Sequence, residues 1–238
     1  MKASGVTNTI LQDLGAAIVS KKFGETSPKV IEADLCETYG ASRSVMREAI
    51  KMLVSKGLIS SKPKQGTRIC PPSEWNLLDP DVLRWMLEGD FSIDLLREFT
   101  EIRMGIERQS VLLASRNATP EDHQMMMACV EGMEAAEAGE NDPLQSDIDL
   151  HLAILKASHN RFLNAHAPLV DTALRFSIQL SNKYKRVRIA NVSDHRNMVE
   201  AIIARDGYRA MQMIEMMMNE VMSFIATAQK DIDSKGAA

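Results

Sequence analysis

Apolar residues recur at helical spacing in the first part of the chain. One stripe lies within residues 8–22, and a second within 31–39, where we expect Ile31, Leu35 and Cys36 to be buried. Positions three and four apart share one face of an α-helix, so each stripe predicts an amphipathic helix with one buried side. The apolar positions of the first stripe are Ile10, Leu11, Leu14, Ala17 and Ile18.

A third amphipathic helix is predicted over residues 42–56, after a turn at Gly40, and its polar side is basic. Ser42 is a favourable N-cap residue, and Arg43 and Arg47 lie on the side opposite the apolar positions. Arg47 either contacts DNA or forms a salt bridge within the domain. For the salt bridge, the partners that we expect are Glu48 and Glu37.

A cationic hairpin is predicted directly after this helix. The strands are expected at Leu58–Ser61 and Thr67–Cys70. The residues at or near the tip are Lys62, Lys64, Gln65 and Gly66. A capped basic helix followed by such a hairpin is typical of a winged helix-turn-helix, which places its second helix in a DNA groove.

From Pro71 onward the pattern changes to long helices. Pro71, Pro72 and Ser73 interrupt regular structure, and we place a domain boundary at about 71–78. No strand-like alternation follows. The predicted helices span residues 79–88, 92–115, 119–139, 143–158, 160–183, 191–205 and 206–230. Six or seven helices of this kind can close into a bundle with an interior cavity.

The expected fold class is therefore mainly α. It combines an N-terminal winged helix-turn-helix with a C-terminal all-helical bundle. The expected parts are a DNA-binding domain at 1–72, a linker and first helix at 73–90, and the bundle at 91–238.

Charge distinguishes the two parts. Residues 1–70 hold 11 Lys and Arg against 6 Asp and Glu, whereas the remainder holds 17 against 26. A basic part joined to an acidic part suggests a polyanion binder attached to a domain with another task, and chance surface composition is the alternative. With 45% hydrophobic residues among 238, the chain can also build a substantial core.

The three cysteines are far apart and odd in number, so no disulfide framework is indicated. No apolar run approaches the length of a membrane span, and the N-terminus lacks a signal-peptide pattern. We therefore expect a cytoplasmic protein with no membrane partner.

Asp147 and His151 stand four residues apart in one predicted helix, so their polar tips can converge. A carboxylate and an imidazole at this spacing are reasonable ligands for a first-row metal, although the spacing alone favours a surface ion pair. His195 begins another amphipathic helix, on the side that is expected to face the bundle interior. It strengthens the metal interpretation.

Arg103 and Arg175 lie among apolar neighbours in long helices. An arginine inside a bundle needs an anionic partner. For Arg103 that partner is either Glu107, four residues later, or the carboxylate of a bound ligand held by two hydrogen bonds. Residue types alone favour the internal pair.

These motifs together resemble the GntR family of bacterial regulators, in the branch whose effector domain is of the FCD type. The N-terminal resemblance rests on Glu32, Leu35, the segment ASRSVMREAI and the wing residue Gly66. The C-terminal resemblance rests on the segment EIRMGIE, the Asp147/His151 pair and a motif that begins at His195. The linker from Trp75 to Phe91 is further similar to that of galactonate-operon repressors.

The resemblance implies functions for individual residues. The DNA-contacting positions fall on Ser42, Arg43, Ser44, Arg47, Lys64, Gln65 and Gly66. The metal positions fall on Asp147, His151 and His195, and the metal is expected to be divalent, Zn or Ni. A fourth family position, often histidine, falls on Met217, so three protein ligands are expected, with open coordination positions for water or effector oxygens.

Two further implications concern the ligands. Arg103, with Thr172 and Arg175 on a facing helix, is expected to bind a small carboxylate effector, a sugar acid such as galactonate or gluconate. A frequently basic DNA-contacting position is Ala33 here, so the operator sequence does not carry over from relatives.

The expected function is a homodimeric, ligand-responsive repressor of a sugar-acid catabolic operon. It is expected to bind a palindromic double-stranded operator and to leave it when effector binds. The alternatives are a regulator that responds to another small carboxylate, a metal-dependent enzyme, and an architectural DNA-binding protein whose helical part only dimerises. An enzyme of this composition would have no use for residues 40–69.

Overall fold

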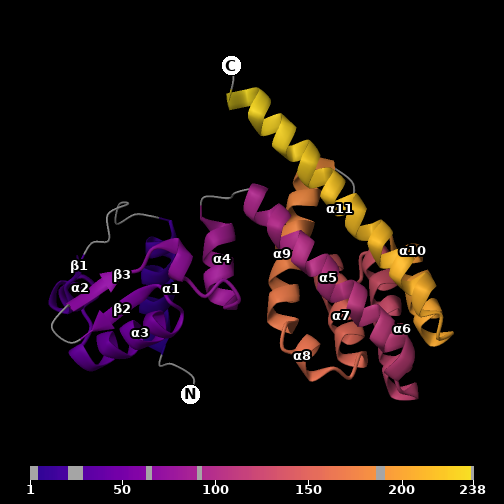
Figure 1. Ribbon diagram of the computed structural model, residues 1–238, viewed down its shortest axis with the longest axis horizontal. Helices are drawn as coiled ribbons and strands as arrows, with labels where there is room; N and C mark the ends of the chain where they lie inside the picture. Colours follow the sequence, from indigo (N-terminus) through magenta and orange to yellow (C-terminus); the bar gives the residue numbers. More distant parts are fainter. Residues whose placement is uncertain (1–4, 21–28, 63–65, 90–92, 186–190, 237–238) are drawn as a thin grey trace. The chain divides into compact units, whose positions relative to one another are not determined.

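The computed structural model describes residues 5–20, 29–62, 66–89, 93–185 and 191–236. The chain forms two compact units, Met1–Phe91 and Ser92–Ala238 (Figure 1). The first is a winged helix-turn-helix and the second is entirely helical where it is described. The predicted fold class is confirmed.

The first unit begins with three α-helices and a small antiparallel sheet, whose strand order in the described residues is β1-β3-β2. Its elements are α1 (Gly5–Val19), β1 (Lys29–Val30), α2 (Glu32–Thr38), α3 (Arg43–Ser55), β2 (Ile59–Lys62) and β3 (Gly66–Ile69). The predicted hairpin is present, with Ile59 opposite Ile69 and Lys62 opposite Gly66. Strand β1 was not predicted, because two residues carry no alternation.

The prediction that Ile31 is buried is wrong. Ile31 is the N-cap residue of α2, and 58% of its surface is exposed. An N-cap residue lies at the edge of its helix with an extended backbone, so the helical stripe that we extrapolated to position 31 does not include it. Leu35 is buried and Cys36 is partly buried, as expected for the interior of that stripe.

The segment 73–90, which we separated as a linker and first helix, belongs to the winged unit, and its described residues, 73–89, pack there. They form a short 3-10 helix, η1 (Pro72–Glu74), and helix α4 (Pro80–Glu88). Trp85 lies against α1, where a Cβ atom at Gly15 would come within 2.4 Å of its ring. The Trp75 indole also belongs to this core and donates a hydrogen bond to the Cys70 carbonyl at 3.0 Å.

Lys56 joins the end of α3 to the start of α4. Its Nζ lies 2.8 Å from Asp79 Oδ1 and 2.8 Å from Asp81 Oδ2, and 5.9 Å from the centre of the Trp85 ring. Gly57 follows with φ +76°, and a Cβ there would lie 2.4 Å from the Glu74 carbonyl oxygen. Only glycine allows this backbone approach.

The second unit is a helical bundle. Its helices are α5 (Ile93–Asn117), α6 (Pro120–Glu137), α7 (Pro143–Ala157), α8 (Arg161–Asn164), α9 (Ala167–Lys185), α10 (Val192–Ile203) and α11 (Gly207–Gly236). Figure 1 shows the long helices α5 and α11 running side by side. No helix in the described part of the chain is long and apolar enough to cross a membrane.

Cap residues explain where the bundle helices start. Thr119 and Asp122 form a capping box in front of α6, and Asp142 accepts a hydrogen bond from the Leu144 amide at the start of α7. Each cap is followed by a proline, which fits the first helical position because no amide hydrogen is needed there.

One predicted helix is divided in the structure. The segment 160–183, expected to be continuous, forms α8 and then α9, with a turn at residues 165–166. Pro168 explains the break, because proline is disfavoured inside a helix but tolerated in its first turn.

We predict that Lys56→Met lowers the free energy of unfolding of the winged unit by about 1–3 kcal/mol, since it leaves Asp79 and Asp81 without their shared cation. Both tryptophans of the chain lie in this unit. Urea denaturation followed by tryptophan fluorescence therefore reports its stability.

The effect should depend on pH. Burial opposes ionisation of Asp81, but the Lys56 ammonium outweighs it and holds the pKa of Asp81 below its ordinary value of 3.8. Such a carboxyl stabilises the fold above its unfolded pKa, and this stability is lost as pH falls through the folded pKa. The difference in the free energy of unfolding between wild type and Lys56→Met should therefore become smaller below about pH 4. Lys51→Met, at an exposed position of α3, is the control; equal losses in the two variants would contradict the prediction.

Candidate functional site

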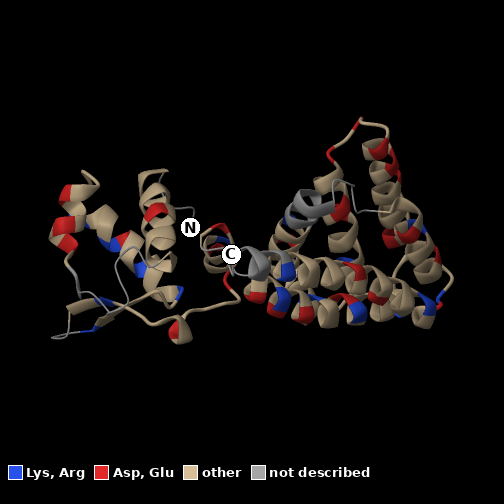
Figure 2. Ribbon diagram, turned by 90° about the horizontal axis from the view of Figure 1, so that it is seen from above, with Lys and Arg blue, Asp and Glu red and all other residues tan. Residues whose placement is uncertain are grey.

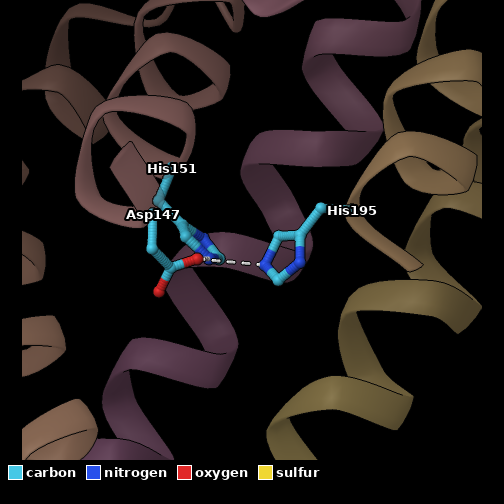
Figure 3. Close-up of side chains that lie close together, drawn as sticks. All are labelled: Asp147, His151 and His195. Carbon is cyan, nitrogen blue, oxygen red and sulfur yellow. Dashed lines mark ion pairs between the residues drawn. The ribbon is translucent and has the colours of Figure 1, made fainter. Parts of the chain in front are cut away.

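Three buried side chains of the bundle converge on one point. Asp147 and His151 extend from successive turns of α7, and His195 extends from the first turn of α10 (Figure 3). One donor atom from each residue lies within 4.8 Å of the other two. None of the three residues is more than 6% exposed. The structure thus brings together the three residues that we expected to bind metal.

The Nε2 atoms of both histidines face the same carboxylate oxygen. Asp147 Oδ1 lies 3.1 Å from His195 Nε2 and 3.6 Å from His151 Nε2. The Nδ1 atoms have other partners: His195 Nδ1 lies 2.9 Å from the carbonyl oxygen of Asn191, the N-cap residue of α10. His151 Nδ1 lies 2.6 Å from Glu107 Oε2 on α5.

The electrostatics of the site follow from two buried carboxylates. Burial would lower the pKa of His151, but Glu107 and Asp147 beside it raise that pKa to about 9. Burial would raise the pKa of Glu107, yet Arg103 and His151 bring it down to about 2. The pKa of Asp147 also lies far below its ordinary value, against the effect of burial, because the imidazoles of His151 and His195 lie beside it.

The residues present fit a divalent cation. Asp147 Oδ1 is fully buried and has no hydrogen bond of good geometry. A buried polar atom of this kind normally has a partner. Two imidazole nitrogens and one carboxylate oxygen form a donor set that suits Zn or Ni and leaves coordination positions open.

Arg103 has one of its two expected partners in the structure. Its Nε donates to Glu107 Oε1, so the internal ion pair is present, and both side chains are almost completely buried. Sequence analysis identified Glu107 as a partner of Arg103 but not of His151. The contact with His151 joins α5 to α7, and helical spacing within one segment gives no signal for it.

The other expected effector residues have partners within the described part of the chain. Arg175 is half-exposed and contacts Asp171 at 2.9 Å and Gln145 at 3.1 Å. Thr172 is buried and donates to the Pro168 carbonyl of its own helix at 2.9 Å. None of these polar partners belongs to the triad. Met217 is partly buried and packs against the main hydrophobic cluster of the bundle.

The polar face of α3 forms the second candidate site. Ser42 caps the helix by accepting a hydrogen bond from the Val45 amide, and Ser42, Arg43 and Ser44 are exposed. Arg47 is exposed too, and its Nε donates to Glu32 Oε1 at 2.9 Å rather than to Glu48 or Glu37. Figure 2 shows Lys, Arg, Asp and Glu on the surfaces of both units.

The wing is described only in part. Gly66 begins β3 with φ +80°, in the left-handed region that favours glycine. Lys64 and Gln65 lie outside the described residues. Their expected contacts with DNA remain predictions.

A winged helix-turn-helix attached to a helical domain with a buried, metal-type donor set defines a class of ligand-responsive DNA-binding regulators. Comparison with known families agrees. The FCD domain family model matches residues 98–220, and that of the bacterial regulatory proteins, gntR family, matches residues 7–69. The chain belongs to the GntR family and carries an FCD domain.

Curated relatives are also regulators. The chain is 30% identical to the galactonate operon transcriptional repressor of Escherichia coli K12, over 87% of this chain and 90% of that protein. It is 31% identical to the putative L-lactate dehydrogenase operon regulatory protein of the same strain, over 93% of this chain and 85% of that protein. The chain is a transcriptional regulator and not an enzyme.

Solved structures share the fold. Lar, which controls the expression of the Listeria monocytogenes agr system, aligns with a TM-score of 0.63 at 15% identity, covering 95% of this chain and 99% of that one. E. coli McbR/YncC aligns with a TM-score of 0.51 at 19% identity, covering 95% of this chain and 99% of that one.

We predict that Arg43→Ala and Arg47→Ala each weaken binding to a duplex selected by the protein from a random library. Each arginine that contacts a phosphate should also contribute about one unit to the slope of log affinity against log salt concentration. Fluorescence anisotropy at several salt concentrations measures both effects. Lys156→Ala, at an exposed position of α7, is the control, and unchanged affinity in both arginine variants would contradict the assignment.

Proposed function

We propose that this regulator is a repressor of a sugar-acid catabolic operon and that an aldonate such as galactonate or gluconate releases it from its operator. The observation that carries the proposal is the buried convergence of Asp147, His151 and His195. The similarity to a galactonate operon repressor supports the choice of ligand class.

The chemistry of the site favours a hydroxy acid. A divalent Zn or Ni ion held by the triad would supply open positions for hard oxygen donors, and an aldonate offers a carboxylate and neighbouring hydroxyls. Arg103, Thr172 and Arg175 are the proposed effector-contacting side chains. The Arg103 fork would reach the effector only through nitrogen atoms that the Glu107 pair leaves free.

Charge balance favours a monocarboxylate. The charges of Arg103 and Glu107 cancel, and Asp147 contributes one negative charge. With neutral histidines, a divalent ion would leave a net charge of +1 in a buried cluster. Uncompensated buried charge is costly, and one effector carboxylate would neutralise it.

A homodimer and a palindromic operator complete the proposal. Two identical winged units would read two half-sites related by the same two-fold symmetry. Ser42, Arg43, Ser44 and Arg47 would contact the DNA from α3, with Lys64, Gln65 and Gly66 contacting it from the wing. The effector would change operator affinity through a coupling free energy of ~1–3 kcal/mol. A repressor of this kind would act in the cytoplasm.

A second ligand class is supported by the relatives. The chain also matches the putative L-lactate dehydrogenase operon regulatory protein, whose name points to a short hydroxy acid. A smaller carboxylate such as a short hydroxy acid is therefore the alternative effector.

We predict that an aldonate raises the operator Kd of the metal-loaded protein by about 5- to 150-fold, which is the range of a typical coupling free energy. Fluorescence anisotropy with a panel of aldonates, with Zn²⁺ or Ni²⁺ and then with a chelator, measures the effect. The chelator should abolish it.

Galactitol, which lacks the carboxylate, is the ligand control and should have no effect. Asp147→Asn is the matched variant and should bind operator but not respond to aldonates. Operator affinity that stays constant across the panel with metal present would contradict the proposal, and a response to short hydroxy acids alone would select the alternative.

A further inference from the structure

Glu107 has two different buried partners, one for each carboxylate oxygen. Oε1 accepts from Arg103 Nε, four residues earlier on α5, and Oε2 lies 2.6 Å from His151 Nδ1 on α7. All three side chains are at most 5% exposed. The carboxylate therefore connects the arginine of one helix to a candidate metal ligand of another.

We infer that Glu107 is a positioning residue for the metal site: it holds His151 with Nε2 available to the metal, and Arg103 holds Glu107 in place. The inference rests on the proposed metal site. It assigns Arg103 a task in addition to effector binding and brings α5 into the metal centre, although α5 contributes no ligand.

The first step concerns the proton of the imidazole. A neutral histidine carries one ring proton, and an ionised carboxylate can only accept hydrogen bonds. Glu107 Oε2 lies 2.6 Å from His151 Nδ1, although the two groups are not aligned as a regular hydrogen bond. An anionic oxygen this close favours a proton on Nδ1 of a neutral His151. The lone pair is then on Nε2, which is the nitrogen that faces Asp147. Outer partners of this kind fix the tautomer and ring orientation of metal-binding histidines.

The second step concerns the charge of Glu107. An ionised carboxylate in a bundle interior is costly unless it is paired. Arg103 lies one turn away on the same helix and supplies a permanent positive charge. It therefore keeps Glu107 ionised and fixes its rotamer, so that the second oxygen points at His151.

The two histidines differ in how they are held. His195 donates to a backbone carbonyl, that of Asn191, which no side-chain substitution removes. His151 depends on the Glu107 side chain. A substitution at position 107 therefore tests the orientation of His151, while His195 keeps its backbone partner.

The test is the affinity of full-length protein for Ni²⁺ or Zn²⁺ alone, measured by competition with a chromophoric chelator. Glu107→Gln keeps the size of the side chain but removes its charge, and its amide can donate to Nδ1 and so permit the other tautomer. We expect a loss of about 10- to 100-fold in metal affinity. Glu101→Gln, at an exposed position of the same helix, should leave the affinity unchanged.

A spectroscopic readout separates positioning from general damage to the fold. The chain has only five histidines, so ¹⁵N-histidine NMR of the Zn²⁺-loaded protein can resolve the ring nitrogens of His151. Wild type should show a slowly exchanging Nδ1 proton with Nε2 bound to zinc. Glu107→Gln should lose this slow exchange while circular dichroism stays that of wild type.

If Glu107→Gln does not fold, the metal affinity of Glu107→Asp tests the inference instead. It keeps the charge near Arg103 but withdraws the carboxylate by one methylene, and a comparable loss of metal affinity is expected. Wild-type affinity in the folded variant, with an unchanged His151 signal, would overturn the inference and leave the metal site intact. Failure of the wild type itself to bind Ni²⁺ or Zn²⁺ would overturn the proposed metal site, and the inference with it.

Discussion

Burial of two carboxylates in a helical bundle is the constraint that organises the effector domain. Asp147 and Glu107 are both almost completely removed from water. Each ionised carboxylate must be compensated locally, because the interior offers no solvent to do so. The side chains that compensate these charges come from α5, α7 and α10. Pairing of the buried carboxylates therefore also holds these three helices together.

The winged unit meets the same requirement in a less buried setting. Lys56 forms ion pairs with two aspartates at the start of α4 and attaches that helix to the end of α3. The basic residues of α3 remain at the surface, where a polyanion can reach them. The winged unit thus uses ion pairs to hold its own helices together, and the pair between exposed Arg47 and Glu32 is one of them.

Local sequence signals determined most helix boundaries. Thr119 before Pro120 and Asp142 before Pro143 are cap-and-proline pairs that act within one turn, so the starts of α6 and α7 could be predicted closely. Pro168, in the first turn of α9, is the same kind of signal and accounts for the break that the apolar pattern does not show. The convergence of Asp147, His151 and His195 could also be predicted, because helical spacing indicated the first two, the amphipathic pattern around His195 indicated the third, and the family resemblance indicated all three.

Contacts between helices could not be predicted in the same way. Arg47 pairs with Glu32 of α2, and Glu107 reaches His151 of α7, over separations that no periodicity encodes. These partners depend on how the helices pack, which is a property of the whole core. The sequence therefore shows which charged side chains need a partner of opposite charge. It does not show which residue of another helix is that partner.

X-ray absorption spectroscopy of the protein loaded with one equivalent of Zn²⁺ tests the central claim, a metal bound by Asp147, His151 and His195 with positions open to effector. The account predicts a first shell of nitrogen and oxygen at ~2.0–2.2 Å with outer scattering from two imidazoles, and a change in the oxygen shell when aldonate is added. A sulfur scatterer at ~2.3 Å, or a shell without imidazole, would contradict it.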